Sequence, residues 1–167
     1  MKKDIIKIPA NQDEIYLYCL VGEALLKTQL LEQALSHSIT LKMNPEETKE
    51  QADKYLKQTQ RYTLGKAIKI AADEELFNST IQKKLGAFLQ ERNWLIHNVI
   101  PGNEEDFNAG KFKEELLIKI KSISDQAENI SRIIETDMID FSASKGKNMS
   151  KIIEMLKLQD SGIRIRK

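Results

Sequence analysis

Cysteine is almost absent from this sequence, because Cys19 is the only thiol among 167 residues. A single cysteine forms no internal disulfide and no metal-thiolate ligand set, so the sequence predicts a fold without such links and a reducing, cytoplasmic environment. Proline and glycine are also scarce, with three and seven residues. Because few residues can form the tight turns of β-hairpins, the sequence favours long helices.

Long apolar runs and an excess of one charge are missing as well. No stretch approaches the roughly 20 apolar residues that cross a membrane, and residues 1–9 hold no signal-peptide core, so we expect no membrane contact. Lysine and arginine total 26 against 25 aspartate and glutamate, which gives a net charge of +1. Such a weak field does not concentrate nucleic acid over a long range, so any RNA contact has to be local.

The common signatures of cofactor enzymes are absent too. The sequence contains no Walker loop, no dinucleotide-binding glycine fingerprint, no cysteine-histidine metal set and no convincing serine triad. We therefore expect no cofactor and no bound metal.

What the sequence does contain is a helical pattern along the chain. With 41% apolar residues, a chain of this length can bury one core, and we predict a single all-α domain over residues 1–167. Apolar spacing and stop signals predict an up-and-down bundle of four to five helices. The helical segments are expected near residues 12–43, 45–60, 64–72, 78–99, 108–139 and 150–158. The segment near 108–139 begins either after Pro101-Gly102-Asn103 or after Asn108-Ala109-Gly110.

Two charged residues fall inside apolar stripes of the expected helices. Glu32 shares a face with Leu17 and Leu35 in segment 12–43, and Arg92 lies near the middle of an apolar arc around Phe88 in segment 78–99. Burying an arginine without a partner would be prohibitively costly. We therefore predict a buried ion pair between Glu32 and Arg92.

The part of the sequence that indicates chemistry is segment 91–98, which reads Glu-Arg-Asn-Trp-Leu-Ile-His-Asn. Arg92 is followed by His97 five residues later, Asn93 comes directly after the arginine, and Leu95 and Ile96 are apolar. The segment closes the C-terminal end of a long amphipathic stretch that Pro101-Gly102 stops.

This pattern resembles the HEPN superfamily, whose signature is an arginine followed four to six residues later by a histidine. Gly22 and Glu32, and then Thr63-Leu64-Gly65, are similar to the layout of small bacterial members. The resemblance covers roughly residues 15–100. It implies a HEPN-like helical bundle and a metal-independent endoribonuclease of the toxin or phage-defence type, whose cleft is built at a homodimer interface from both copies of the motif.

The resemblance also implies partners for the chain. These are an RNA substrate, a second copy of the chain and, in a toxin setting, an antitoxin or a nucleotidyltransferase. In members paired with a minimal nucleotidyltransferase, a tyrosine often stands two residues after the histidine as a modification target. Val99 occupies that position here, which speaks against control by nucleotidylation of a tyrosine at that site.

Helix geometry constrains how the motif can work. On a regular helix Arg92 and His97 are separated by about 140° around the axis, whereas Asn93 and His97 are close enough to touch. Either the helix loosens near Trp94, or the site combines groups from two chains.

Metal-free RNA cleavage defines the roles expected of the motif. Histidine can take the proton from the 2′-hydroxyl or give one to the leaving 5′-oxygen, and the planar arginine fork stabilises the charge of the five-coordinate phosphate. The expected products are a 2′,3′-cyclic phosphate and a 5′-hydroxyl. The catalytic candidates are Arg92, Asn93 and His97, with Glu32 as structural support and Trp94 and Asn98 as candidates for RNA contact.

A structural alternative exists for these residues. Arg92 would serve only as the partner of Glu32, His97 as a cation favoured at a helix C-terminus, and Trp94 as a core or interface filler. Asn93 either holds the His97 ring or caps carbonyls at the helix end. The rival function is a non-catalytic HEPN-like dimeric module that binds a nucleotide or a partner protein, and the third is a helical scaffold.

Overall fold

The computed structural model describes residues 9–43 and 48–161 of the chain. These residues form helices and their connections, with no β-strand among them, so the predicted all-α class is confirmed. Seven α-helices and one 3-10 turn are present in this part of the chain, which exceeds the expected four to five helices. None of the described helices is both long and apolar enough to span a membrane.

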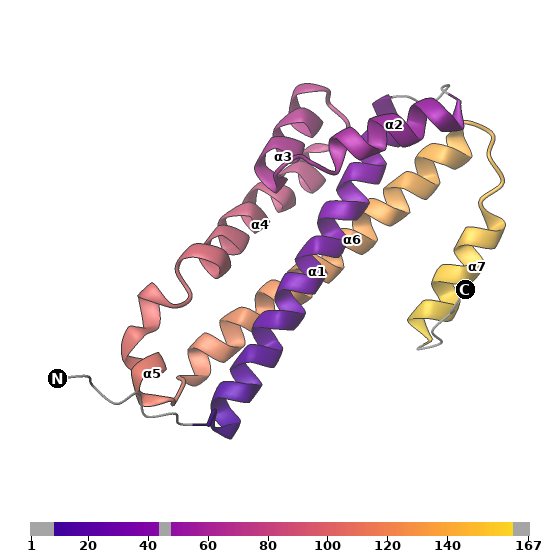
Figure 1. The fold of residues 1–167 in the computed structure, drawn as a ribbon. Helices are drawn as coiled ribbons and strands as arrows, with labels where there is room; N and C mark the ends of the chain where they lie inside the picture. Colours follow the sequence, from indigo (N-terminus) through magenta and orange to yellow (C-terminus); the bar gives the residue numbers. More distant parts are fainter. Residues whose placement is uncertain (1–8, 44–47, 162–167) are drawn as a thin grey trace.

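Three long helices form the body of the molecule: α1 (Gln12–Met43), α4 (Ser79–His97) and α6 (Glu114–Ser144). Figure 1 shows α1 and α6 side by side over most of their length, with α4 beside them. Ion pairs from Lys27 to Glu128 and from Lys42 to Asp137 show that α1 and α6 run parallel. Consecutive long helices therefore alternate in direction along the chain.

The core lies where these three helices face one another, because each presents a stripe of apolar side chains spaced three or four residues apart. Its largest fully buried apolar side chains come from all three helices and from the start of α3: Leu17, Leu31, Leu35, Ile39, Leu64, Leu85, Phe88, Ile120, Ile123 and Ile134.

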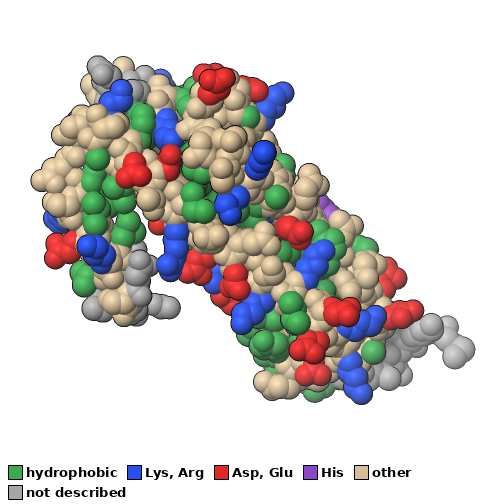
Figure 2. All heavy atoms as spheres, turned by 180° about the vertical axis from the view of Figure 1, so that it is seen from behind, with side chains coloured by type: hydrophobic (Ala, Val, Ile, Leu, Met, Phe, Trp, Pro, Cys, Tyr) green, Lys and Arg blue, Asp and Glu red, His purple; other side chains and the backbone are tan. Residues whose placement is uncertain are grey.

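Short helices connect and flank the long ones. α2 (Lys49–Thr59) begins after the capping residue Thr48 and leads into α3 (Leu64–Asp73), which Thr63 caps. The expected start of this segment at residues 45–47 lies outside the described residues. α7 (Ser150–Asp160) follows α6 but stands apart from the bundle in Figure 1, and the hollow between it and the body is visible in Figure 2.

The connection between α4 and α6 decides where the next long helix begins, which the sequence left open between a start after Asn103 and one after Gly110. A 3-10 turn (Pro101–Asn103) and the short helix α5 (Glu104–Ala109) come first, and α5 ends at Gly110, whose φ of 62° is left-handed. Glycine adopts this conformation at little cost and commonly ends helices in this way. The long helix α6 consequently starts at Glu114 and runs on to Ser144.

An N-cap residue and a lysine of α1 hold the start of α4, the helix that carries segment 91–98. The Asn78 side chain accepts a hydrogen bond from the Ile81 amide at 3.0 Å, which satisfies one free donor of the first turn. Just before it, the Leu76 carbonyl accepts a 2.7 Å hydrogen bond from Lys42 of α1. Lys42 also pairs with Asp137 of α6, so this cation joins the beginning of α4 to both other long helices.

Candidate functional site

The motif lies in one uninterrupted α-helix. α4 continues through Trp94 to His97, and the Asn98 amide donates to the Trp94 carbonyl at 2.8 Å to close the last turn. The helix therefore does not loosen near Trp94. Arg92 and His97 stay about 140° apart around the axis and about 7.5 Å apart along it, so a single copy of the chain does not direct both side chains to one point.

Glu32 and Arg92 meet as predicted, but their pair is only partly buried. The distance from Arg92 Nη2 to Glu32 Oε1 is 3.6 Å, and the side chains are 27% and 32% exposed. The expectation of a buried pair was wrong on this point, because α1 packs closely on α6 rather than on α4 and solvent reaches both side chains. Arg92 Nε, in contrast, is buried without a hydrogen-bond partner among the described residues.

Asn93 takes a role that the sequence did not predict. Its side-chain oxygen accepts a 3.4 Å hydrogen bond from Arg92 Nη1, so the amide neither holds the His97 ring nor caps a carbonyl. Glu32 and Asn93 together hold the guanidinium from two sides. The guanidinium is thereby oriented before any ligand arrives, which reduces the entropy cost of using it on a phosphate.

His97 and Asn98 lie at the exposed end of the helix. Within the described part of the chain, no hydrogen bond or ion pair holds the His97 side chain, so its ring nitrogens are accessible. Asn98 acts through its backbone, since its carbonyl accepts a 2.9 Å hydrogen bond from the Gly102 amide. This hydrogen bond gives Asn98 a structural role at the C-cap of α4, and that role requires no contact with RNA.

The Trp94 ring packs against a side chain of α6. The Lys119 ammonium lies 3.8 Å from the centroid of the indole ring and 3.9 Å from a carboxylate oxygen of Glu91. Lys119 adds a second cation near the motif, and no spacing in the sequence places a residue of α6 beside a residue of α4. The two cations of this region each stand next to a carboxylate, Glu32 or Glu91, so a single copy offers little local positive charge.

Exposed apolar side chains and a mainly polar hollow lie next to the motif. Ile96 and Ile100 are exposed large apolar side chains on either side of His97 in sequence. Near Glu32, a hollow of about 300 Å³ is lined by Gln29, Glu32, Gln33, Ser36, Gln60 and Tyr62. Amide groups and an aromatic ring suit a nucleobase, whereas the Glu32 carboxylate would repel a phosphate there.

The described residues include no group of three or more histidine, cysteine, aspartate or glutamate side chains that could hold a metal ion. Comparisons of the chain with protein-family models, curated proteins and solved structures returned no match.

Proposed function

We propose that this protein is a metal-independent, HEPN-type endoribonuclease of the toxin or phage-defence class, with a composite site formed by Arg92, Asn93 and His97 of two copies. The observation that carries the proposal is the end of α4. There an accessible histidine and an arginine oriented by Glu32 and Asn93 occupy different sides of one regular helix. Two copies around a two-fold axis supply both groups to one phosphate, which one copy does not.

The chemistry follows from the two side chains. His97 of one copy takes the proton of a 2′-hydroxyl, the 2′-oxygen attacks the adjacent phosphorus, and the 5′-oxygen leaves after protonation by the second histidine. An Arg92 guanidinium stabilises the five-coordinate phosphate by charge-assisted hydrogen bonds. The products are a 2′,3′-cyclic phosphate and a 5′-hydroxyl.

A non-catalytic HEPN-like dimeric module is the second candidate, and one observation favours it. Glu32 lies beside Arg92 and Glu91 beside Lys119, so each cation is partly neutralised before RNA arrives. A module of this kind would bind a nucleotide or a protein, such as an antitoxin, through the same surface without cleaving RNA.

Incubation of the purified protein with mixed cellular RNA in excess chelator separates the two candidates. We expect cleavage with cyclic-phosphate ends. We expect His97→Ala to abolish it while thermal stability stays unchanged, because the residue is exposed and its side chain makes no hydrogen bond or ion pair with described residues. Lys84→Ala changes an exposed residue of α4 about three and a half turns before His97. It is the matched control and should cleave normally. Cleavage that requires magnesium or survives His97→Ala would refute the catalytic role.

A further inference from the structure

The hollow of about 300 Å³ beside Glu32 takes no part in the chemistry proposed above. We call it the Glu32 hollow, and its volume lies at the lower end of the range of small-molecule sites, which suits a single base. Four of its lining residues lie on α1 within about 100° of one another around the helix axis, and two lie at the connection from α2 to α3. These residues are Gln29, Glu32, Gln33 and Ser36 of α1, and Gln60 and Tyr62 of the connection.

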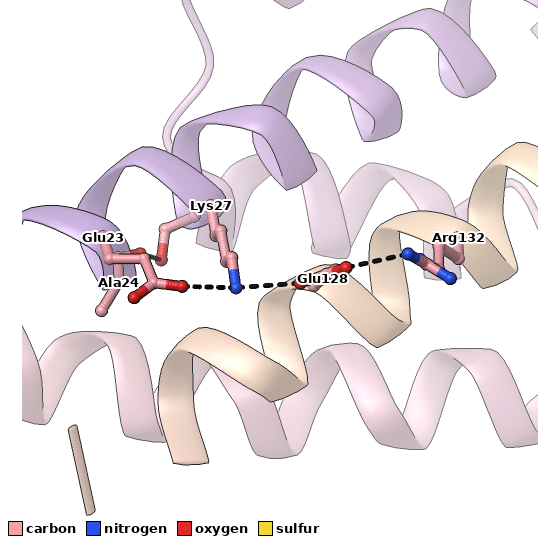
Figure 3. Close-up of polar contacts among 6 residues, drawn as sticks. Glu23, Ala24, Lys27, Glu128 and Arg132 are labelled. Carbon is pink, nitrogen blue, oxygen red and sulfur yellow. Dashed lines mark hydrogen bonds and ion pairs between the residues drawn. The ribbon is translucent and has the colours of Figure 1, made fainter. Parts of the chain in front are cut away.

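Both walls of the Glu32 hollow are held in place without a ligand. The buried hydroxyl of Thr59, the last residue of α2, lies 3.1 Å from the Thr40 hydroxyl of α1. On nearly the opposite side of α1, Figure 3 shows Lys27 between two carboxylates, 2.7 Å from Glu23 and 2.8 Å from Glu128 of α6. These contacts fix α1 against α2 and α6, so a ligand meets a site that is already formed and loses less entropy on binding.

The polar groups of the Glu32 hollow have unused capacity for hydrogen bonds. Within the described part of the chain, the side-chain amides of Gln29, Gln33 and Gln60 make no hydrogen bond with protein. The Glu32 carboxylate is 3.6 Å from Arg92, which is too long for a hydrogen bond, so both of its oxygens can accept from a ligand. The hollow therefore presents a half-buried pair of acceptors with amide donors around it.

Guanine is the RNA base that matches this set of groups. Its Watson–Crick edge carries two neighbouring donors, N1–H and N2–H₂, which the two oxygens of one carboxylate accept side by side. Its O6 and N7 are acceptors for amide N–H groups. Adenine and cytosine carry a ring-nitrogen acceptor beside their amino group, and uracil has a carbonyl on each side of its N–H. Each of these bases would turn an acceptor toward Glu32 and be repelled.

We infer that the Glu32 hollow binds a guanine base of single-stranded RNA. Glu32 accepts from N1–H and N2–H₂, and the amides of Gln29 and Gln33 supply donors for O6 and N7. Tyr62 provides an aromatic ring on which the base stacks. The Lys66 ammonium lies 4.0 Å from the centroid of this ring and covers one of its faces, so stacking uses the other face. The phosphates stay outside the hollow, because the Glu32 carboxylate repels them.

The same carboxylate connects the base with the motif. Arg92 does not line the hollow, but its guanidinium lies 3.6 Å from the Glu32 carboxylate that does. A phosphate attached to the bound guanosine consequently has an oriented guanidinium nearby. This connection rests on the proposed function, and it makes guanosine the nucleotide beside the cleaved phosphate. Binding of the base itself does not depend on cleavage.

The first test measures the affinity of the wild-type protein for short RNA strands by fluorescence anisotropy. The probes are pentauridylates whose central base is replaced by guanine, adenine or hypoxanthine, with 2′-fluoro sugars that lack the attacking hydroxyl. We expect the guanine strand to bind at least about tenfold more tightly than the other two, because hypoxanthine lacks only the N2 amino group that donates to Glu32. Equal affinity for the guanine and adenine strands overturns the inference.

Guanosine 5′-monophosphate, measured as a competitor in the same assay, distinguishes a free nucleotide from a guanosine within a strand. We expect the strand to bind more tightly, because it carries a phosphate on each side of the guanosine. A free nucleotide that binds as tightly as the strand would overturn the assignment to RNA.

The second test uses Glu32→Gln, which separates reading of the base from support of Arg92. A carboxamide has one acceptor and one donor side and no longer matches two neighbouring donors. We therefore expect the preference for the guanine strand over the adenine strand to disappear, while circular dichroism shows an intact fold. If Glu32 only supported the arginine, the variant would bind both strands less tightly and keep their ratio, and that result overturns the inference.

The double variant Gln29→Ala/Gln33→Ala tests the hollow without touching the carboxylate. Both residues are exposed, so the fold should survive, and we expect the guanine strand to bind about fivefold more weakly. Gln126→Ala, at an exposed glutamine of α6, is the matched control and should bind like the wild type. A double variant with wild-type affinity would contradict the role of the two amides.

The inference and the proposed function fail separately. A protein that prefers the guanine strand but cleaves no RNA leaves the Glu32 hollow standing and refutes the nuclease. A protein that cleaves through His97 at all four nucleotides alike, and binds the guanine and adenine strands equally, refutes the hollow and leaves the nuclease standing. If both hold, sequencing of the cleaved ends should place the cuts beside guanosine, and Glu32→Gln should lose this pattern.

Discussion

Removing the two charges of the Glu32–Arg92 pair, singly and together, should reveal a coupling of about 1–1.5 kcal/mol. At 3.6 Å, Coulomb's law gives about 1 kcal/mol in bulk water and about 4.6 kcal/mol at an effective dielectric constant of 20. The side chains are about a quarter to a third exposed and the pair is too long for a hydrogen bond, so screening and the ordering of two long side chains reduce the net value toward the lower limit.

The variants are Glu32→Gln, Arg92→Met and the double substitution, because glutamine and methionine keep most of the packing of the original stems. Urea denaturation of all four proteins gives the coupling as the departure from additivity. The Glu91–Lys119 pair, at 3.9 Å and more exposed, is the matched comparison and should couple by less than about 0.5 kcal/mol. A coupling below about 0.3 kcal/mol for Glu32–Arg92 would show that the arginine is not positioned by Glu32.

Two further predictions concern the frame around the site. Gly110→Ala should destabilise the fold by about 2 kcal/mol, because φ is 62° and the new Cβ would lie 2.8 Å from Asn11 Nδ2. Gly102→Ala, which meets nothing within 4 Å, should cost much less in the same denaturation assay. Hydrogen bonds from Lys27 lower the pKa of Glu23 and of Glu128, so their contribution is present above the ordinary value of 4.5 and is lost as the pH falls through the lowered pKa. In Lys27→Met the free energy of unfolding should therefore fall less steeply below about pH 4.5 than in the wild type. An equal decrease in the two proteins would contradict this.

Much of the fold follows from local signals in the sequence. The apolar steps of α1 and α6 depend only on residues within a few positions of one another, so single-sequence reasoning reaches them. The break at Gly110 is harder to locate, because residues 104–109 have helical propensity and only the left-handed glycine separates α5 from α6. Whether the chain continues as one helix there depends on the contact between Asn11 and Gly110, which joins residues 99 positions apart.

The candidate site was harder to predict from the sequence than the fold. The pairing of Glu32 with Arg92 was predictable because both charges fall on apolar stripes. Its exposure was not, since that depends on how closely α4 approaches α1 in the folded protein. Lys119 over Trp94 was missed for a similar reason. A sequence gives the phase of each helix separately, and the rotation of one helix relative to another is set by packing of the whole core.

The distribution of charge connects the proposed dimer to the proposed chemistry. In one copy each cation near the motif has a carboxylate neighbour, so an RNA phosphate gains little by approaching a monomer. Two Arg92 and two His97 residues around one axis concentrate donors in a single groove without changing the near-neutral charge of the chain. Activity measured across a dilution series should fall with the dimer fraction. Full activity in a proven monomer would refute the composite site.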